Sequence, residues 1–243
     1  MLTEMTINGL DIKTYNARLQ NYSVSGTTVT NTTSSVGDLL KMPILFSRAL
    51  GTRTITITLT FKPSRLGSDS RGTTVMDKLT VAADNIARFE ADIVGKVVEI
   101  TLPDGFMYTS LVTTLPPATF DSSGEHDVTY TFMAIRHKAE ETRKLSAYGV
   151  VISKATTAVP FKITIVIPSE YDEFTVCGIK VFNLSANDEI VIDGVNGIIT
   201  CNGINKFLET DFIEFPVLQP GRNVIECTAE DAEITVVYTP VYV

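Results

Sequence analysis

The chain is poor in histidine, the side chain used most often in general acid–base catalysis. Its two histidines, His126 and His137, lie in the first half, so no Ser-His-Asp or Cys-His arrangement can form within the second half. His126 stands between Glu125 and Asp127 in a predicted turn, where we expect an exposed side chain, and His137 ends a predicted strand. We therefore predict a catalytic role for neither histidine.

The three cysteines, Cys177, Cys201 and Cys227, lie in apolar, strand-like runs. Because an odd number cannot form a closed set of disulfides, we predict buried free thiols. A metal site is the alternative, but zinc usually requires closely spaced Cys or His pairs, and the sequence has no such pair around these cysteines.

Acidic side chains of the second half suggest two further kinds of site. The calcium candidates are Asp188, Glu189, Asp193, Asn196 and Gly197, and the candidates for glycoside hydrolysis are Glu209, Asp211, Glu214 and Glu226. The first group matches no calcium-binding loop, and turn formation explains it better. The chain has no Trp, the residue on which sugar rings most often stack, although Tyr171 or Tyr238 could substitute. We predict no catalytic, cofactor-binding or metal-binding residues.

Length and charge indicate two globular units. The chain has 243 residues, 44% of them hydrophobic and 20% charged, which is enough apolar material for two cores. The net charge of −8 is uneven: residues 1–143 carry 14 Lys and Arg against 15 Asp and Glu, whereas residues 144–243 carry 6 against 13. An acidic second half argues against nucleic-acid binding there. We find no signal-peptide pattern and no apolar run of about 18 residues, so we predict folding in a cytosol without membrane insertion.

The first half shows alternation typical of strands. Over residues 54–61 four apolar side chains fall on one face and four threonines on the other, which predicts a half-buried strand. Further strands are predicted over 97–102, 106–112 and 128–136. A core-packing helix is predicted between residues 74 and 92 from apolar residues spaced three and four apart, namely Val75, Leu79, Ala82, Ile86 and Phe89.

The second half reads as short strands separated by Asx-Gly and Pro-Gly turns. We predict strands over 161–167, 175–182, 189–192, 197–201, 223–228 and 233–238. This pattern is typical of an antiparallel sandwich or jelly roll. The charged segment 138–144 is a predicted linker or exposed helical turn, which gives domains 1–140 and 141–243. Residues 23–35, rich in Thr, Ser and Gly, are either a polar strand or a loop.

Basic residues concentrate between positions 41 and 71. They are Lys41, Arg48, Arg53, Lys62, Arg65 and Arg71. Two interpretations stay open: a solvated rim, or a contact with another subunit or an acidic partner surface.

The order of these signals resembles that of the distal tail proteins of long-tailed phages that infect Gram-positive bacteria. In the first half the resemblance rests on Ile7-Asn8-Gly9-Leu10-Asp11-Ile12, Gly51-Thr52-Arg53, the helix, Leu102-Pro103-Asp104-Gly105 and the strand that ends at His137. The second half is similar to the galectin-like sandwich of that family. The matching motifs are Glu189-Ile190-Val191-Ile192-Asp193, Cys201-Asn202-Gly203, Phe212, Phe215-Pro216, Leu218, Pro220-Gly221-Arg222-Asn223 and Val237-Tyr238-Thr239-Pro240.

The resemblance implies a mainly β structural protein rather than an enzyme. Its N-terminal domain, a β-barrel or sandwich with one packed helix, would form a ring of six copies, and its C-terminal galectin-like sandwich would project outward. The implied partners are the tail tube protein and the tail-associated or receptor-binding baseplate proteins, at the virion tail tip, after assembly in the host cytoplasm. The signature residues of sugar-binding galectins have no counterpart here, and fold alone does not imply sugar binding.

Three other functions remain open at this point. The chain could be a tail tube subunit with an added surface domain, a carbohydrate-binding adhesin module, or a hydrolase. Strand edges that a neighbouring subunit could cover favour the ring, and the threonine side of residues 54–61 could line a wet channel or a polar interface.

Overall fold

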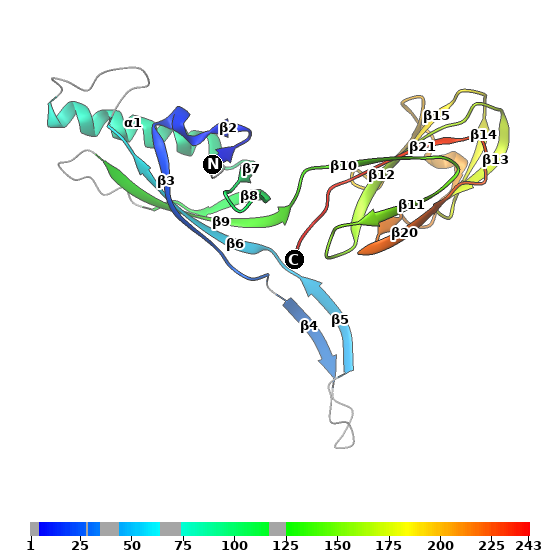
Figure 1. Cartoon of the computed structure of the whole chain (residues 1–243), viewed down its shortest axis with the longest axis horizontal. Coiled ribbons are helices and arrows are strands. Elements are labelled where there is room, and N and C mark those ends of the chain that lie inside the picture. Colours follow the sequence, from blue (N-terminus) through cyan, green and yellow to red (C-terminus); the bar gives the residue numbers. More distant parts are fainter. Residues whose placement is uncertain (1–4, 28, 35–43, 64–73, 117–124) are drawn as a thin grey trace. The chain divides into compact units, whose positions relative to one another are not determined.

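The computed structural model describes residues 5–27, 29–34, 44–63, 74–116 and 125–243, with the backbone alone over 29–34 and 44–50. It is built mainly of antiparallel strands, so the predicted fold class is confirmed (Figure 1). The chain divides into two compact units, Met1–His137 and Lys138–Tyr242, which we call unit 1 and unit 2. In the described part of the chain, no helix has the length and apolar character needed to cross a membrane.

Unit 1 is organised around one seven-stranded antiparallel sheet with the strand order β2-β1-β7-β8-β9-β6-β3. Its strands are β1 (Thr6–Ile7), β2 (Leu10–Asp11), β3 (Ala17–Val24), β6 (Arg53–Phe61), β7 (Val97–Thr101), β8 (Met107–Thr114) and β9 (His126–His137). A short 3₁₀ helix, η1 (Ile12–Tyr15), links β2 to β3. Between β3 and β6, the strands β4 (Val29–Ser34) and β5 (Ile44–Leu50) pair with each other and with no other described strand.

Strand β6 is central to this sheet and follows the predicted alternation. Its apolar side chains Ile55, Ile57, Leu59 and Phe61 are fully buried. The same face of β9 buries its own alternating apolar residues, because the two strands pair residue by residue from Arg53 to Phe61. The prediction of a half-buried strand is confirmed.

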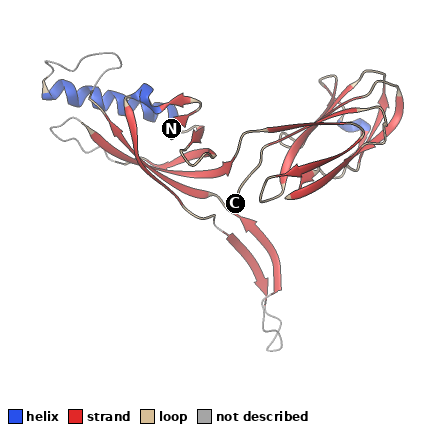
Figure 2. Cartoon of the chain, viewed as in Figure 1, coloured by secondary structure: helices blue, strands red, loops and turns tan. Residues whose placement is uncertain are grey.

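Helix α1 (Val75–Ile93) covers one face of the unit 1 sheet, as Figure 2 shows. Thr74 caps its N-terminus: the Thr74 hydroxyl accepts a hydrogen bond from the Asp77 amide, and the Asp77 carboxylate accepts one from the Thr74 amide. The ring of Phe89 lies at centroid distances of 5.0 to 5.7 Å from the rings of Tyr15, Phe61 and Tyr130.

The apolar stripe predicted for this helix is correct only over its later turns. Ala82, Ile86 and Phe89 are buried, but Val75 is 53% exposed. The buried residues of the helix begin at Ala82, so the three-four spacing extends over a first turn whose side chains are exposed.

Unit 2 is a sandwich in which two groups of strands share one core. One sheet has the order β10-β21-β12-β15-β16-β17, with β19 also paired to β12. The opposing strands are β13-β14-β18 and β11-β20, joined by a bridge between Val176 and Cys227. Buried side chains come from both sides, for example Ile163 of β12 and Val181 of β14.

The strand bounds of unit 2 are β10 (Glu141–Leu145), β11 (Tyr148–Ser153), β12 (Val159–Val166), β13 (Tyr171–Val176), β14 (Ile179–Leu184), β15 (Glu189–Asp193), β16 (Ile198–Cys201), β17 (Ile204–Asn205), β18 (Thr210–Asp211), β19 (Val217–Leu218), β20 (Gly221–Glu226) and β21 (Glu233–Tyr238). A short 3₁₀ helix, η2 (Phe207–Glu209), precedes β18.

Two predictions for this unit are wrong in detail. The single strand expected over residues 175–182 is the hairpin β13–β14, because Cys177 and Gly178 adopt φ of 48° and 83° and turn the chain in two residues. The helical turn expected within 138–144 is strand β10 from Glu141 onward, because that segment pairs along β21. The pairing partner lies about a hundred residues later, beyond the reach of local patterns.

Candidate assembly surfaces

The face of the unit 1 sheet opposite α1 carries a band of threonines on β6 and β9. Thr54, Thr56 and Thr58 of β6 and Thr129 and Thr131 of β9 form this threonine face. Thr56 lies opposite Thr131, and the hydroxyls of Thr58 and Thr129 are hydrogen-bonded at 2.9 Å. Since α1 packs on the other side, this face is free to contact water or another protein.

Large apolar side chains continue the same face toward β7. Val97, Leu111 and Met133 lie opposite one another on β7, β8 and β9, and they are 69%, 36% and 43% exposed. Ile135, two residues beyond Met133, is also exposed. We call these four residues the apolar row. Single exposed apolar residues are common, but neighbouring ones on adjacent strands are typical of a protein contact.

Two arginines lie close together at one end of the sheet. The Arg53 guanidinium Nη1 donates a hydrogen bond to the Ser25 carbonyl at 2.9 Å, and burial together with the nearby Arg136 lowers the pKa of Arg53. Arg136 lies over the ring of Phe106, 4.6 Å from its centroid. Of the predicted basic cluster, Lys62 is exposed and Arg48 is described by its backbone alone. Lys41, Arg65 and Arg71 lie outside the described residues.

Both histidines are part of strand β9 and both are buried. The expectation of an exposed turn at His126 is wrong, because His126 pairs with Phe61 of β6 and falls on the buried face with Val128 and Tyr130. His137 is hydrogen-bonded through Nε2 to the hydroxyl of Thr109 at 3.0 Å. Their positions are those of structural residues at the two ends of one strand.

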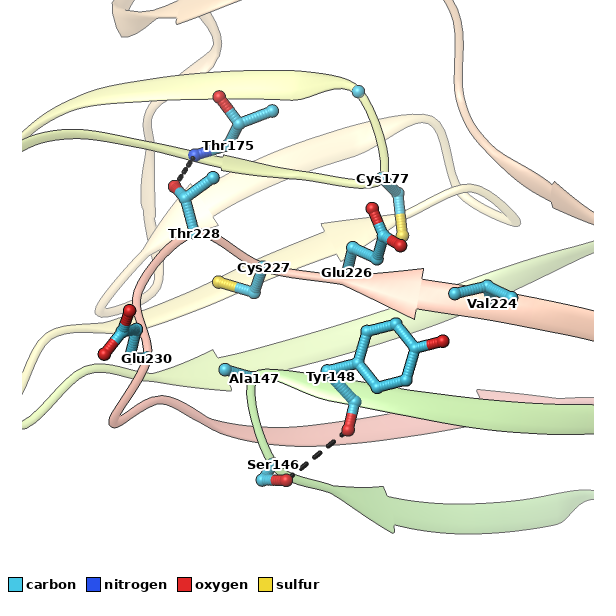
Figure 3. A pocket seen from close by; sticks show the side chains of 11 residues that line it. Ser146, Ala147, Tyr148, Thr175, Cys177, Val224, Glu226, Cys227, Thr228 and Glu230 are labelled. Carbon is cyan, nitrogen blue, oxygen red and sulfur yellow. Dashed lines mark hydrogen bonds between the residues drawn. The ribbon is translucent and has the colours of Figure 1, made fainter.

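A groove of about 830 Å³ in unit 2 lies beside β11, β20 and the β13–β14 turn (Figure 3). Tyr148 and Val224 give it apolar lining, and Glu226 and Glu230 give it two acidic side chains. The thiols of Cys177 and Cys227 also line it. Figure 3 shows Tyr148 on β11 and Cys177 at the β13–β14 turn, so the groove depends on the fold rather than on one sequence motif.

All three cysteines are free, as predicted; Cys201 and Cys227 are buried and Cys177 is partly exposed. Burial, with a smaller effect of the nearby Cys227, raises the pKa of Cys177 to about 11. Burial also raises the pKa of Cys201 and Cys227. The thiols are therefore neutral near pH 7 and poor nucleophiles.

Two of the acidic residues weighed for calcium, Asp188 and Asp193, accept hydrogen bonds within turns, as the sequence predicted. The Asp188 carboxylate accepts hydrogen bonds from the Ser185 amide and from Asn202 Nδ2, both at 2.8 Å, and the first of these helps hold the pKa of Asp188 below its usual value. Asp193 accepts hydrogen bonds from the amide and side chain of Asn196. Among the described residues, no group of three or more His, Cys, Asp or Glu side chains could hold a metal ion.

Glu209, one of the glutamates weighed for hydrolysis, has surroundings that favour its charged form. Glu209 accepts hydrogen bonds from Lys206 Nζ at 2.8 Å and from Asn183 Nδ2 at 3.1 Å, and these lower its pKa. A glycosidase acid needs the opposite shift, toward neutral pH. Glu226 lies in the groove of Figure 3, which is lined by no His, Lys or Arg.

Comparison with known protein families gives the class of the C-terminal unit. Residues 154–242 match the model of the siphovirus-type tail component, C-terminal domain. This segment covers β12 to β21 and so contains most of the sandwich. No curated protein sequence matches the chain. Unit 2 is thus similar, over most of its length, to the C-terminal domain of siphovirus-type tail components.

Solved structures extend the likeness to the whole chain. The crystal structure of the phage SPP1 Dit (gp 19.1) protein, described as a hub adsorption apparatus of phages that infect Gram-positive bacteria, matches with a TM-score of 0.75. The identity is 15%, over 99% of each chain. Two structures of the phage p2 baseplate in its activated conformation, with Sr and with Ca, match at 13% and 14% identity and TM-scores of 0.48 and 0.47. Coverage is 96% and 97% of the two chains in the first case, and 93% and 92% in the second.

The chain has the fold of a distal tail (Dit) protein. The resemblance seen in the sequence is confirmed by the fold of the whole chain and by the match of residues 154–242 to the tail component model.

Proposed function

We propose that this chain is a structural protein of a phage tail tip, a hub between the tail tube and the host-recognition apparatus. The observation that carries the proposal is the coincidence of two matches: a siphovirus tail component over residues 154–242, and a Dit fold over nearly the entire chain. In this role residues 1–140 form a ring of six copies and residues 141–243 form the outer, galectin-like domain.

The open face of unit 1 supports ring formation. The threonine face and the apolar row together offer polar and apolar contacts on a flat sheet surface that α1 does not cover. A head-to-tail contact between such surfaces closes into a ring when its rotation divides a full turn. The contact buries Val97 and Met133, whose exposure in the isolated chain is unfavourable.

The proposed role consists of binding other proteins and involves no reaction catalysed by this chain. The proposed partners are further copies of this chain, the tail tube protein and tail-associated or receptor-binding baseplate proteins. Catalysis, cofactors, sequence-specific nucleic-acid binding and membrane insertion have no part in it. The protein assembles in the bacterial cytoplasm and resides at the virion tail tip.

Light scattering on a sizing column, over a range of protein concentrations, tests the ring. Six copies of the 26.5 kDa chain give about 159 kDa as one discrete species. A monomer at every concentration, including in the presence of purified tail tube protein, would contradict ring formation. A ladder of growing polymers would instead favour a tube subunit.

A pair of variants locates the contact. Met133→Asp places a charge in the apolar row and is expected to reduce the 159 kDa species to monomer. Ile152→Asp introduces the same charge at a comparably exposed apolar position of unit 2 and is expected to leave the ring intact. Circular dichroism of both variants checks that the fold is retained.

A further inference from the structure

Unit 2 exposes large apolar side chains over one continuous segment that ring formation by unit 1 does not use. They are Val195, Ile198, Ile204, Phe207, Leu208, Ile213 and Val217. Leu208 is 98% exposed and Ile213 is 88% exposed. We call these seven residues the 195–217 surface. Exposure of this kind in a segment of some twenty residues is well above the scattered apolar residues of an ordinary surface.

A cluster of three phenylalanine rings connects the 195–217 surface to the core of the sandwich. The rings of Phe207 and Phe212 lie 4.9 Å apart between centroids, and those of Phe212 and Phe215 lie 4.6 Å apart. Phe212 and Phe215 pack against the buried core of the sandwich. The loop that carries Leu208 and Ile213 is therefore attached to the core through neighbouring side chains, which lowers the entropy cost of binding there.

A small hollow lies at one edge of the surface. Ile198 and Phe207 line a groove of about 140 Å³ together with Gly197 and Asn205. Lys206 lies next to Phe207, and its amide donates a hydrogen bond to the Ile199 carbonyl. This bond holds the start of η2 beside β16. Its size suits one apolar side chain of a partner.

The charge around this surface is acidic. Between residues 189 and 217 the sequence has five acidic residues and one basic residue, Lys206. Lys206 already pairs with Glu209 at 2.8 Å. Asp211 and Glu214 are exposed. Asp211 lies opposite Lys180 of β14, but the Lys180 ammonium pairs with Glu173 at 3.3 Å, and neither Asp211 nor Glu214 takes part in an ion pair with the described residues. Their charges are therefore available to cations of a partner.

These charges distinguish between two possible binding partners of the surface, a second copy of this chain and a different protein. If two copies of the chain met through this same surface, Asp211 and Glu214 of one copy would face those of the other, and like charges in contact oppose association. A partner with basic side chains beside apolar ones satisfies both features of the surface. We propose that the 195–217 surface binds a separate protein through an apolar element flanked by Lys or Arg side chains. The proposal concerns unit 2 alone and does not depend on ring formation.

The test measures binding of a designed peptide to the full-length protein by fluorescence anisotropy. The probe is a labelled peptide of alternating leucine and lysine, and its counterpart replaces each lysine with glutamate. The leucine–lysine peptide is expected to bind at least about tenfold more tightly, because it matches both the apolar area and the charge. Equal binding of the two peptides overturns the proposal.

Matched variants then localise the binding. The double variant Leu208→Ser and Ile213→Ser is expected to weaken binding about tenfold, since both side chains are exposed and their loss leaves the core intact. The control, Tyr148→Ser with Ile152→Ser, removes two similarly exposed apolar side chains on β11 and is expected to leave binding unchanged. If the control weakens binding as much as the test variant, the surface is not the site.

Two further measurements fix the chemistry and the occupant. Asp211→Asn with Glu214→Gln is expected to weaken binding several-fold at low salt, and this difference should vanish near 1 M salt, where charges are screened beyond about 3 Å. Sedimentation velocity compares the mass of the wild type with that of the Leu208→Ser, Ile213→Ser variant. Equal masses support a separate partner, whereas a smaller mass for the variant means that a second copy occupies the surface and overturns the proposal.

Discussion

The two units close their cores in different ways. Unit 1 has one sheet, and α1 covers one face of it while the threonine face and the apolar row stay open. Unit 2 brings two groups of strands together, so both inner faces are buried against each other. Unit 1 therefore leaves one sheet face uncovered by α1, whereas unit 2 buries the inner faces of both groups of strands and exposes apolar side chains outside that core.

The largest expected effect is the loss of unfolding free energy when a buried phenylalanine is truncated in one unit, which tests whether the two cores unfold independently. Phe89→Ala removes the ring that touches three other aromatic rings beneath α1, and it is expected to cost unit 1 about 3–5 kcal/mol of unfolding free energy. Phe161→Ala, at an equally buried position of β12, is expected to cost unit 2 a similar amount. Calorimetry of each variant should show one transition lowered and the other unchanged. A joint shift of both transitions would mean that the two cores unfold as one.

Cysteine alkylation reports on unit 2 alone, because the sequence has no cysteine outside residues 138–242. Burial raises the pKa of Cys177 to about 11, so the reactive thiolate is scarce at pH 8 and becomes abundant only as the pH approaches that value. Alkylation of native Cys177 by iodoacetamide at pH 8 is expected to be about 100-fold slower than in urea. Mass spectrometry gives both rates. Equal rates would show that unit 2 opens on the timescale of the reaction.

Two glycine turns offer a matched pair, one in each unit. Gly9 and Gly178 have φ of 77° and 83°, and a Cβ at either position would meet no atom within 4 Å. Replacement by Ala therefore costs backbone strain alone, about 1 kcal/mol in each unit, measured by urea unfolding. Gly26→Ala, at a position without positive φ, is the control and should be neutral. A much larger loss at Gly178 would show that the sandwich depends on this turn more than unit 1 depends on its own.

The smallest effect concerns the cap of α1. Thr74→Ala removes the hydroxyl that accepts from the Asp77 amide and is expected to cost about 1 kcal/mol or less, because the first turn is exposed and can fray. Thr80→Ala, whose hydroxyl donates back to the Met76 carbonyl, should be neutral. The described residues contain one α-helix, α1, so the helical ellipticity at 222 nm reports on unit 1. A change in the unit 2 transition would be inconsistent with separate cores.

Local patterns predicted the elements whose environment is uniform along their length. Strand β6 has the same buried face from Ile55 to Phe61, so alternation alone identified it. The bounds of helix α1 were predicted to within a residue at each end, but its apolar stripe was wrong at the first turn, where the environment changes from buried to exposed. The order of such elements was sufficient to indicate the distal tail fold.

Other features depend on contacts that local patterns do not contain. Cysteine rarely adopts a positive φ, as Cys177 does here, so Gly178 was the one local signal for the turn in the middle of residues 175–182. His126 was taken for a turn residue because of its acidic neighbours, but pairing with Phe61 buries it. One feature of the sequence indicated the apolar row: Met133 and Ile135 alternate with apolar residues of the other face, so both faces of this part of β9 are apolar. The sequence alone did not show which of the two faces is exposed.

The hairpin β4–β5 has a consequence for how such proteins can diversify. Strands β3 and β6 already pair up to Val24 and Ile55, and the Ser25 amide donates a hydrogen bond to the Thr54 carbonyl. The two ends of the inserted segment are therefore held together whatever its length. Doubling such an insertion costs only about 0.6 kcal/mol of closure entropy. Evolution, or a protein engineer, can lengthen, shorten or exchange this segment as a cassette without disturbing the register of the sheet that carries it.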